Sequence, residues 1–157
     1  MVWLLGKLKQ FTQFSCLPFA EKFLWFQVIY YLAIFRIKLI VISPKNVFAE
    51  VIGHSASQHP IQTSFITSDR IAIIINKVSE LLPISTCLSK ALASYVLFKK
   101  YRYLAELHIG VLKNDRQRLE AHAWLSYGGK IIIGNLPDLS RFRELPLKTI
   151  TNQLWVE

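Results

Sequence analysis

Four residues in the second half of the chain carry side chains suited to nucleophilic catalysis at a carbonyl group: Cys87, His122, Asn135 and Asp138. A cysteine attacks as its thiolate, a histidine beside it accepts and returns the proton, and a third group fixes the histidine ring and its tautomer. These residue types indicate acyl-transfer chemistry, provided that the fold brings them together.

Cys87 is expected in the first turn of a helix. Apolar residues from Leu88 to Val96 recur at steps of three and four, and Ser85 or Thr86 precedes them as a candidate N-cap. Unpaired backbone N–H groups and the positive end of the helix dipole favour a thiolate at such a position. The alternative interpretation is a small buried hydrophobe, which is what most free cysteines are.

His122 is expected on the first strand of a β-hairpin. The segments 121–127 and 130–135 flank Gly128-Gly129, and two glycines between apolar runs are typical of a tight two-residue turn. Another strand is predicted just before it, over residues 103–112, where apolar and polar side chains alternate.

The third group has two candidates. With the two glycines in the turn, the register places His122 opposite Asn135, and directly opposed residues share one face of a sheet. Asn135 would then hold the imidazole N–H that does not face Cys87, as an asparagine does in papain-like enzymes. Asp138 takes this role if a β-bulge shifts the register. The pairing rule favours Asn135.

The first third of the chain is rich in large apolar side chains. It predicts a short helix near residues 4–14 and a longer one near residues 19–40, both packed as core, with Pro44 closing the helical stretch. The apolar run 23–35 is followed closely by basic residues, whereas a membrane-spanning helix needs about 20 apolar residues. Core packing is therefore preferred over membrane contact.

Length and composition favour one compact unit. With 157 residues, 52% of them hydrophobic, the chain can build one core, and extensive disorder is excluded. We expect an apolar helical region over 1–53, a polar loop over 54–68 and a core over 69–157. Ser68 and Asp69 are expected to cap a helix that ends before Pro83.

Net charge and cysteine content limit the classes of binding partner and the cellular compartment that we expect. Nineteen Lys and Arg against ten Asp and Glu give a net charge of +9, spread along the chain, which favours anionic partners without choosing one. The basic and aromatic run 98–103 is better explained as a helix end than as a nucleic-acid site. Two cysteines suit a reducing cytoplasm, with Cys16 a packed thiol, and no metal-ligand spacing or cofactor motif is present.

Several short segments resemble one known family when they are taken together in order. They are Cys87-Leu88 with Ala91-Leu92, Leu107 to Val111, Ala121-His122-Ala123-Trp124, Gly134-Asn135, and Pro137 to Leu145. Over about residues 71–145 the chain resembles the leader peptidases of lasso peptide biosynthesis. The similarity is to the form in which a transglutaminase-like cysteine protease is separate from its leader-binding partner.

The resemblance implies an α+β fold, in which a papain- or transglutaminase-like core packs the cysteine helix on a small antiparallel sheet bearing the histidine. It implies removal of the leader from a ribosomally made precursor, with Cys87 as nucleophile and His122 as base and acid. The implied partners are the precursor peptide, a small leader-recognition (PqqD-like) protein and an asparagine-synthetase-like macrolactam cyclase.

The chain departs from the family at two places. The family usually has an acidic residue near the position of Gly134-Asn135, and another where this chain has Ser126. A non-catalytic interaction or scaffold protein of the same fold, acting in a peptide-maturation complex, is therefore the alternative.

Overall fold

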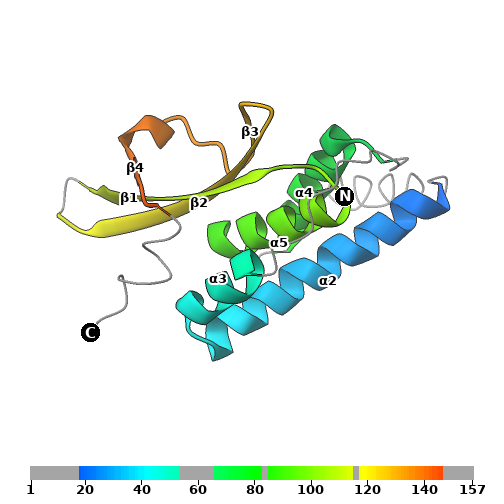
Figure 1. Cartoon of the computed structure of the whole chain (residues 1–157), viewed down its shortest axis with the longest axis horizontal. Coiled ribbons are helices and arrows are strands. Elements are labelled where there is room, and N and C mark those ends of the chain that lie inside the picture. Colours follow the sequence, from blue (N-terminus) through cyan, green and yellow to red (C-terminus); the bar gives the residue numbers. More distant parts are fainter. Residues whose placement is uncertain (1–17, 54–65, 83–84, 115–116, 147–157) are drawn as a thin grey trace, which may run out of the picture.

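The protein is an α+β structure in which helices cover one face of a small antiparallel sheet (Figure 1). The computed structural model describes residues 18–53, 66–82, 85–114 and 117–146. Its helices are α2 (Phe19–Val41), α3 (Pro44–Gly53), α4 (Ser68–Leu81) and α5 (Cys87–Lys100). Its strands are β1 (Glu106–Lys113), β2 (Leu119–Tyr127), β3 (Lys130–Ile133) and β4 (Arg143–Glu144), with a 3₁₀ turn η1 at Leu139–Arg141.

The long helix predicted near residues 19–40 is confirmed as α2. One of its faces buries Leu24, Val28, Leu32 and Phe35 at steps of three and four residues, as expected for a helix that packs on a core. Of the described helices, α2 is long and apolar enough to cross a membrane, a test that core helices also pass.

The helical stretch does not stop at Pro44. α2 ends at Val41, and Pro44 is the first residue of α3, which the sequence analysis missed. A proline fits the first turn of a helix because its missing N–H would have no intrahelical partner there. The prediction that Pro44 closes the helical stretch is therefore wrong, because Pro44 begins a new helix.

The two middle helices begin at side-chain caps. Thr67, rather than the expected Ser68, caps α4 by accepting a hydrogen bond from Arg70 N. Of the two predicted cap candidates, Ser85 and Thr86, it is Thr86 that caps α5, and α5 starts at Cys87 as predicted. α5 lies between α2 and the sheet (Figure 1). Its fully buried Leu97 and Phe98 are part of the core.

The sheet has the strand order β3-β2-β1-β4 with antiparallel pairing throughout. The turn at Gly128-Gly129 is confirmed, and both residues have positive φ angles, which glycine adopts without strain. A bulge between Leu125 and Ser126 then shifts the register, and β3 ends at Ile133. The predicted opposition of His122 and Asn135 is therefore wrong, because β3 does not extend far enough to pair with His122.

The chain after β3 folds over the outer face of the sheet, away from the helices (Figure 1). It passes through η1 and returns as β4, a two-residue strand that the sequence did not reveal. Gly110 of β1 allows this close packing: a Cβ atom there would lie 2.9 Å from Phe142 Cβ and from the Trp124 ring.

Some predictions fall on parts of the chain outside the described residues. These are the short helix near residues 4–14, the packed thiol Cys16 and nearly all of the polar loop 54–68.

Candidate active site

Cys87 is the first residue of α5 and is exposed. The Thr86 side chain accepts a hydrogen bond from Ser89 N, and the Ser89 side chain in turn accepts one from Thr86 N at 2.9 Å. This capping box fixes the start of the helix. The thiol is therefore held beside the free N–H groups of the first turn, where a negative charge is stabilised.

A pocket of about 280 Å³ lies beside this thiol. Cys87 and His122 both line it, although they are 35 positions apart in the chain and belong to a helix and a strand. The other lining residues are all apolar: Pro44, Phe48, Leu88, Ile109, Val111, Leu119, Ala121, Ala123 and Leu145. The structure thus brings the two principal predicted residues to one pocket.

The His122 ring is fixed by a backbone carbonyl and two aromatic neighbours. Its Nε2 lies 2.7 Å from Gly134 O. Since a carbonyl oxygen can only accept, Nε2 carries the proton, and in the neutral ring Nδ1 keeps its lone pair. The ring stacks on Trp124, with centroids 6.2 Å apart, and packs against Phe142 at 5.7 Å.

Gly134 can approach β2 so closely because it is a glycine. It follows the last residue of β3, has a φ of +75°, and a Cβ atom there would lie 2.7 Å from Ala123 O. Any larger residue would push this turn away from the strand. The turn places the Gly134 carbonyl against His122.

Neither Asn135 nor Asp138 forms a hydrogen bond or ion pair with His122. Asn135 is exposed just beyond Gly134, and Asp138 is exposed with its carboxylate 3.8 Å from Arg141. The place predicted for one of these two side chains is taken by the Gly134 carbonyl. The sequence could not single out this carbonyl, because every residue has one. The sign that the sequence did offer was the residue type at position 134, a glycine.

His122 differs from the other β2 residues of the pocket in the direction of its side chain. Ala121 and Ala123 belong to the sheet face that meets the helices, whereas His122 and Trp124 alternate with them and stack on the outer face. β3 pairs with β2 only from Leu125 to Tyr127, so His122 has no strand partner on that side, where the Gly134 turn packs instead. Among the described residues, no hydrogen bond joins the Cys87 thiol to the His122 imidazole. The two residues are related by lining the same pocket.

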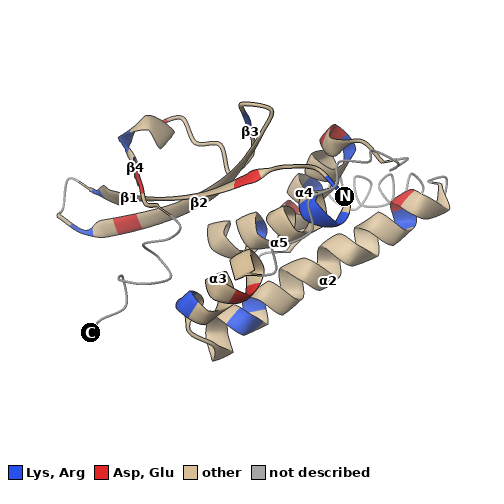
Figure 2. Ribbon diagram, viewed as in Figure 1, with Lys and Arg blue, Asp and Glu red and all other residues tan. Residues whose placement is uncertain are grey.

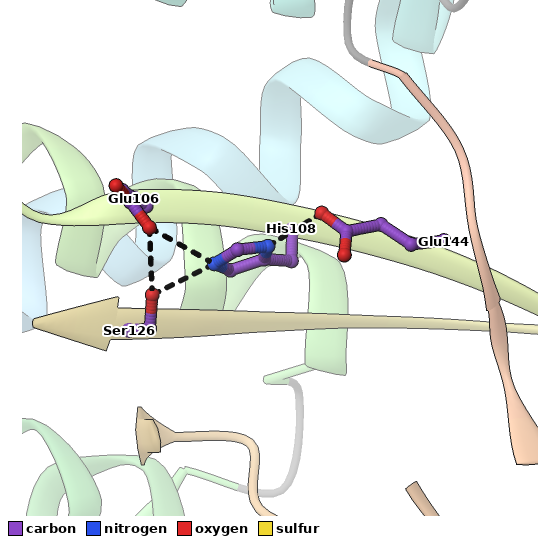
Figure 3. Close-up of polar contacts among 4 residues, drawn as sticks. All are labelled: Glu106, His108, Ser126 and Glu144. Atoms are coloured by element: carbon purple, nitrogen blue, oxygen red, sulfur yellow. Dashed lines mark hydrogen bonds and ion pairs between the residues drawn. The ribbon is translucent and has the colours of Figure 1, made fainter. Parts of the chain in front are cut away.

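A second polar cluster, which the sequence analysis missed, lies on the outer face of the sheet (Figure 3). His108 Nδ1 lies 2.6 Å from Glu144 Oε1, and His108 Nε2 lies 2.7 Å from Ser126 Oγ. Ser126 Oγ is also 3.3 Å from Glu106 Oε2. The signal in the sequence was the alternation of Glu106 and His108 on β1, which places them on one face.

This cluster connects β4 to the middle of the sheet. Glu144 belongs to β4, His108 to β1 and Ser126 to β2. The His108 ring stacks on Trp124, with centroids 5.5 Å apart and planes 8° from parallel. Trp124 is thus packed between His108 and His122. The outer cluster therefore supports the His122 ring through Trp124.

The fold and this pocket define a class of protein: a helix-start cysteine over an antiparallel sheet that carries a histidine. The comparison of the sequence with protein families agrees with this class. The family described as Transglutaminase-like superfamily matches residues 35–146, and the chain belongs to it. The superfamily commonly contains cysteine peptidases. No curated protein and no solved structure gives a significant match.

Proposed function

We propose that this protein is a cysteine peptidase that removes the leader from a ribosomally made lasso precursor peptide. The observation that carries the peptidase part is the pocket that Cys87 and His122 share, with Cys87 at a capped helix N-terminus. Membership of the transglutaminase-like superfamily supports the same chemistry. The lasso substrate rests on the resemblance of the segments around Cys87, His108 and His122 to the lasso leader peptidases.

The reaction follows from the two side chains. The Cys87 thiolate attacks the scissile carbonyl carbon, and protonated His122 gives its proton to the leaving amine as the C–N bond breaks. His122 then takes a proton from water as the water oxygen attacks the thioester carbon. The C–S bond breaks, the Cys87 thiolate is restored, and the leader leaves as a carboxylate. The Cys87 backbone N–H is a candidate donor to the oxyanion.

His122 must turn toward the thiol when substrate binds. Its Nε2 is bonded to Gly134 O, so Nδ1 is the atom that would face Sγ. Catalytic hydrogen bonds are often long or misaligned in free enzymes and tighten in the substrate complex.

The proposed pathway has three partners. The precursor peptide is delivered by a small leader-recognition protein, and an asparagine-synthetase-like cyclase joins the freed amino terminus to an acidic side chain. We assign these steps to the cytoplasm, where a thiol stays reduced.

The test mixes precursor peptide, recognition protein and this chain, and follows leader removal by mass spectrometry. Cys87→Ala should abolish cleavage, and His122→Ala should slow it by at least about 100-fold, the usual contribution of general acid–base catalysis. Asn135→Ala and Asp138→Ala are the matched controls, which should stay within severalfold of wild type because neither residue forms a hydrogen bond or ion pair with His122. Cleavage by Cys87→Ala at the wild-type rate would end the proposal.

A non-catalytic scaffold is the second candidate, because within the described residues no acidic side chain forms a hydrogen bond or ion pair with His122. In that case wild type would bind the recognition protein and the precursor and leave the precursor intact. The same mass spectra decide between the two functions.

A further inference from the structure

The pocket beside Cys87 is lined mainly by apolar side chains. α3 contributes Pro44 and Phe48, β1 contributes Val111, and the residue after β4 is Leu145. None of its lining residues is charged at neutral pH, apart from any charge on Cys87 or His122. The chain as a whole has a net charge of +9, yet no Lys or Arg is among the residues that line the pocket. Figure 2 marks the Lys and Arg of the described residues along the ribbon.

The size of the pocket limits what it can hold. Ligand sites for small molecules usually measure about 300–1,000 Å³, and this pocket of about 280 Å³ falls just below that range. It is suited to one large side chain rather than to a cofactor or a folded peptide. Its position next to the thiol means that the side chain would belong to a residue close to the bond that Cys87 attacks.

We propose that this pocket selects substrates by an apolar side chain of leucine or phenylalanine type, within two residues of the scissile bond. This inference rests on the peptidase function proposed above. Burial of such a side chain favours binding, whereas a carboxylate or ammonium group would lose its hydration and find no partner among these walls. Selection between Leu and Asp should amount to about 10- to 100-fold in cleavage rate.

Leu119 offers a way to change the selectivity without disturbing the core. It lines the pocket and is 73% exposed. Leu119→Glu therefore places a carboxylate at the rim, and it should raise cleavage of peptides with Lys relative to those with Leu. Leu104→Glu is the matched control, because Leu104 is 76% exposed and lies outside the pocket.

The first experiment uses precursor peptides with Leu, Phe, Asp or Lys at each of the two residues on either side of the cleavage site. Preference for Leu and Phe at one position, shifted toward Lys by Leu119→Glu and unchanged by Leu104→Glu, supports the inference. Equal cleavage of Leu and Asp peptides at all four positions would overturn it.

The second experiment measures alkylation of Cys87 by iodoacetamide and by N-benzyl iodoacetamide, two uncharged reagents. In both reactions Sγ displaces iodide from the methylene carbon, so a C–S bond replaces a C–I bond and the thiol proton goes to solvent. The benzyl reagent should react about 10-fold faster, because its ring enters the pocket. If the benzyl reagent reacts faster but no precursor is cleaved, the apolar pocket is supported and the proposed peptidase function is contradicted. Cleavage with no benzyl preference would overturn the pocket inference alone.

Discussion

A backbone carbonyl fixes the ring of His122, and this decides which ring nitrogen carries the proton. A carboxylate or amide side chain could hold the ring in a similar way, but a carbonyl of the main chain moves only with its turn. The Gly134 turn is tied to β2 by a close approach to Ala123 O. The position of the ring therefore depends on one residue that has no side chain.

Gly134→Ala should damage both stability and reactivity. The added Cβ would meet Ala123 O at 2.7 Å, so the turn must move and take its carbonyl from His122. Gly129→Ala is the control, since Gly129 has the same φ of +75° but open space around its Cβ position. Urea denaturation should show a loss of about 1–2 kcal/mol for Gly129→Ala, from the left-handed backbone alone, and a larger loss for Gly134→Ala.

Cys87 alkylation rates complete the comparison of the two glycines. Only Gly134→Ala should change the rate, because only this variant releases the His122 ring, and His122 lines the same pocket as Cys87. Equal stability losses for the two variants would contradict the close approach.

At the scale of single residues, the sequence predicted the helix-start thiol well and the third group poorly. The position of Cys87 depends on local rules, a cap at Thr86 followed by an apolar repeat, and the structure follows them. The partner of His122 depends on the register of the hairpin, which the bulge at Leu125/Ser126 shifts. A bulge is decided by packing on both faces of the sheet, and no residue type in the hairpin marks it.

At the scale of elements, α5 sets the environment of the thiol through its cap. Thr86→Ala should lower the free energy of unfolding by about 1 kcal/mol and fray the first turn. Cys87 alkylation should then slow by roughly 2- to 5-fold, the equivalent of about 0.3–1 kcal/mol of interaction with a helix terminus. Thr67→Ala removes the matching cap of α4, so it should cost similar stability and leave the alkylation rate unchanged. Equal effects of both variants on the rate would contradict a local role for the Thr86 cap.

The pKa of Lys90 on α5 is lowered by burial of its ammonium group, with Glu80 partly opposing the shift. Its folded-state pKa lies below the unfolded value, so the buried charge costs stability at neutral pH. That cost is relieved as the pH rises through the folded pKa toward 10.5. Lys90→Met should therefore be more stable than wild type at pH 7, by an amount that shrinks as the pH approaches 10.5. Urea titrations across this range, with the exposed Lys77→Met as control, measure the difference; a gap that widens with pH would contradict the sign.

The elements that the sequence missed are short or begin with an ambiguous residue. α3 has ten residues and starts at Pro44, which is equally suited to end one helix and to begin another. β4 has two residues, Arg143 and Glu144, and pairs with β1 only after the chain has crossed the outer face of the sheet. Long periodic segments such as α2 were predicted well because their burial pattern extends over many turns.

At the scale of the whole molecule, α2 joins the N-terminal region to the rest of the fold. It packs against α4 and α5, and Glu21 near its start forms an ion pair with Arg70 of α4 at 2.6 Å. Gln27 donates a hydrogen bond to the Tyr101 hydroxyl beyond the end of α5. The family match begins at residue 35, inside α2, yet these contacts come from the part of the helix that precedes it.

The first half of α2 should therefore unfold together with the sheet. Leu24 is fully buried and Phe26 is 64% exposed, so the two residues probe opposite faces of the same turn. Leu24→Ala should lower the free energy of unfolding by about 2–5 kcal/mol, and Phe26→Ala should change it by less than about 0.5 kcal/mol. Amide hydrogen exchange of β1 and β2 is the decisive measurement: Leu24→Ala should speed exchange in these strands by the factor that its stability loss implies, because their slowest amides open only by global unfolding. Unchanged exchange in the sheet, with faster exchange confined to α2, would show that the helix opens on its own and that the core beside Cys87 does not depend on it.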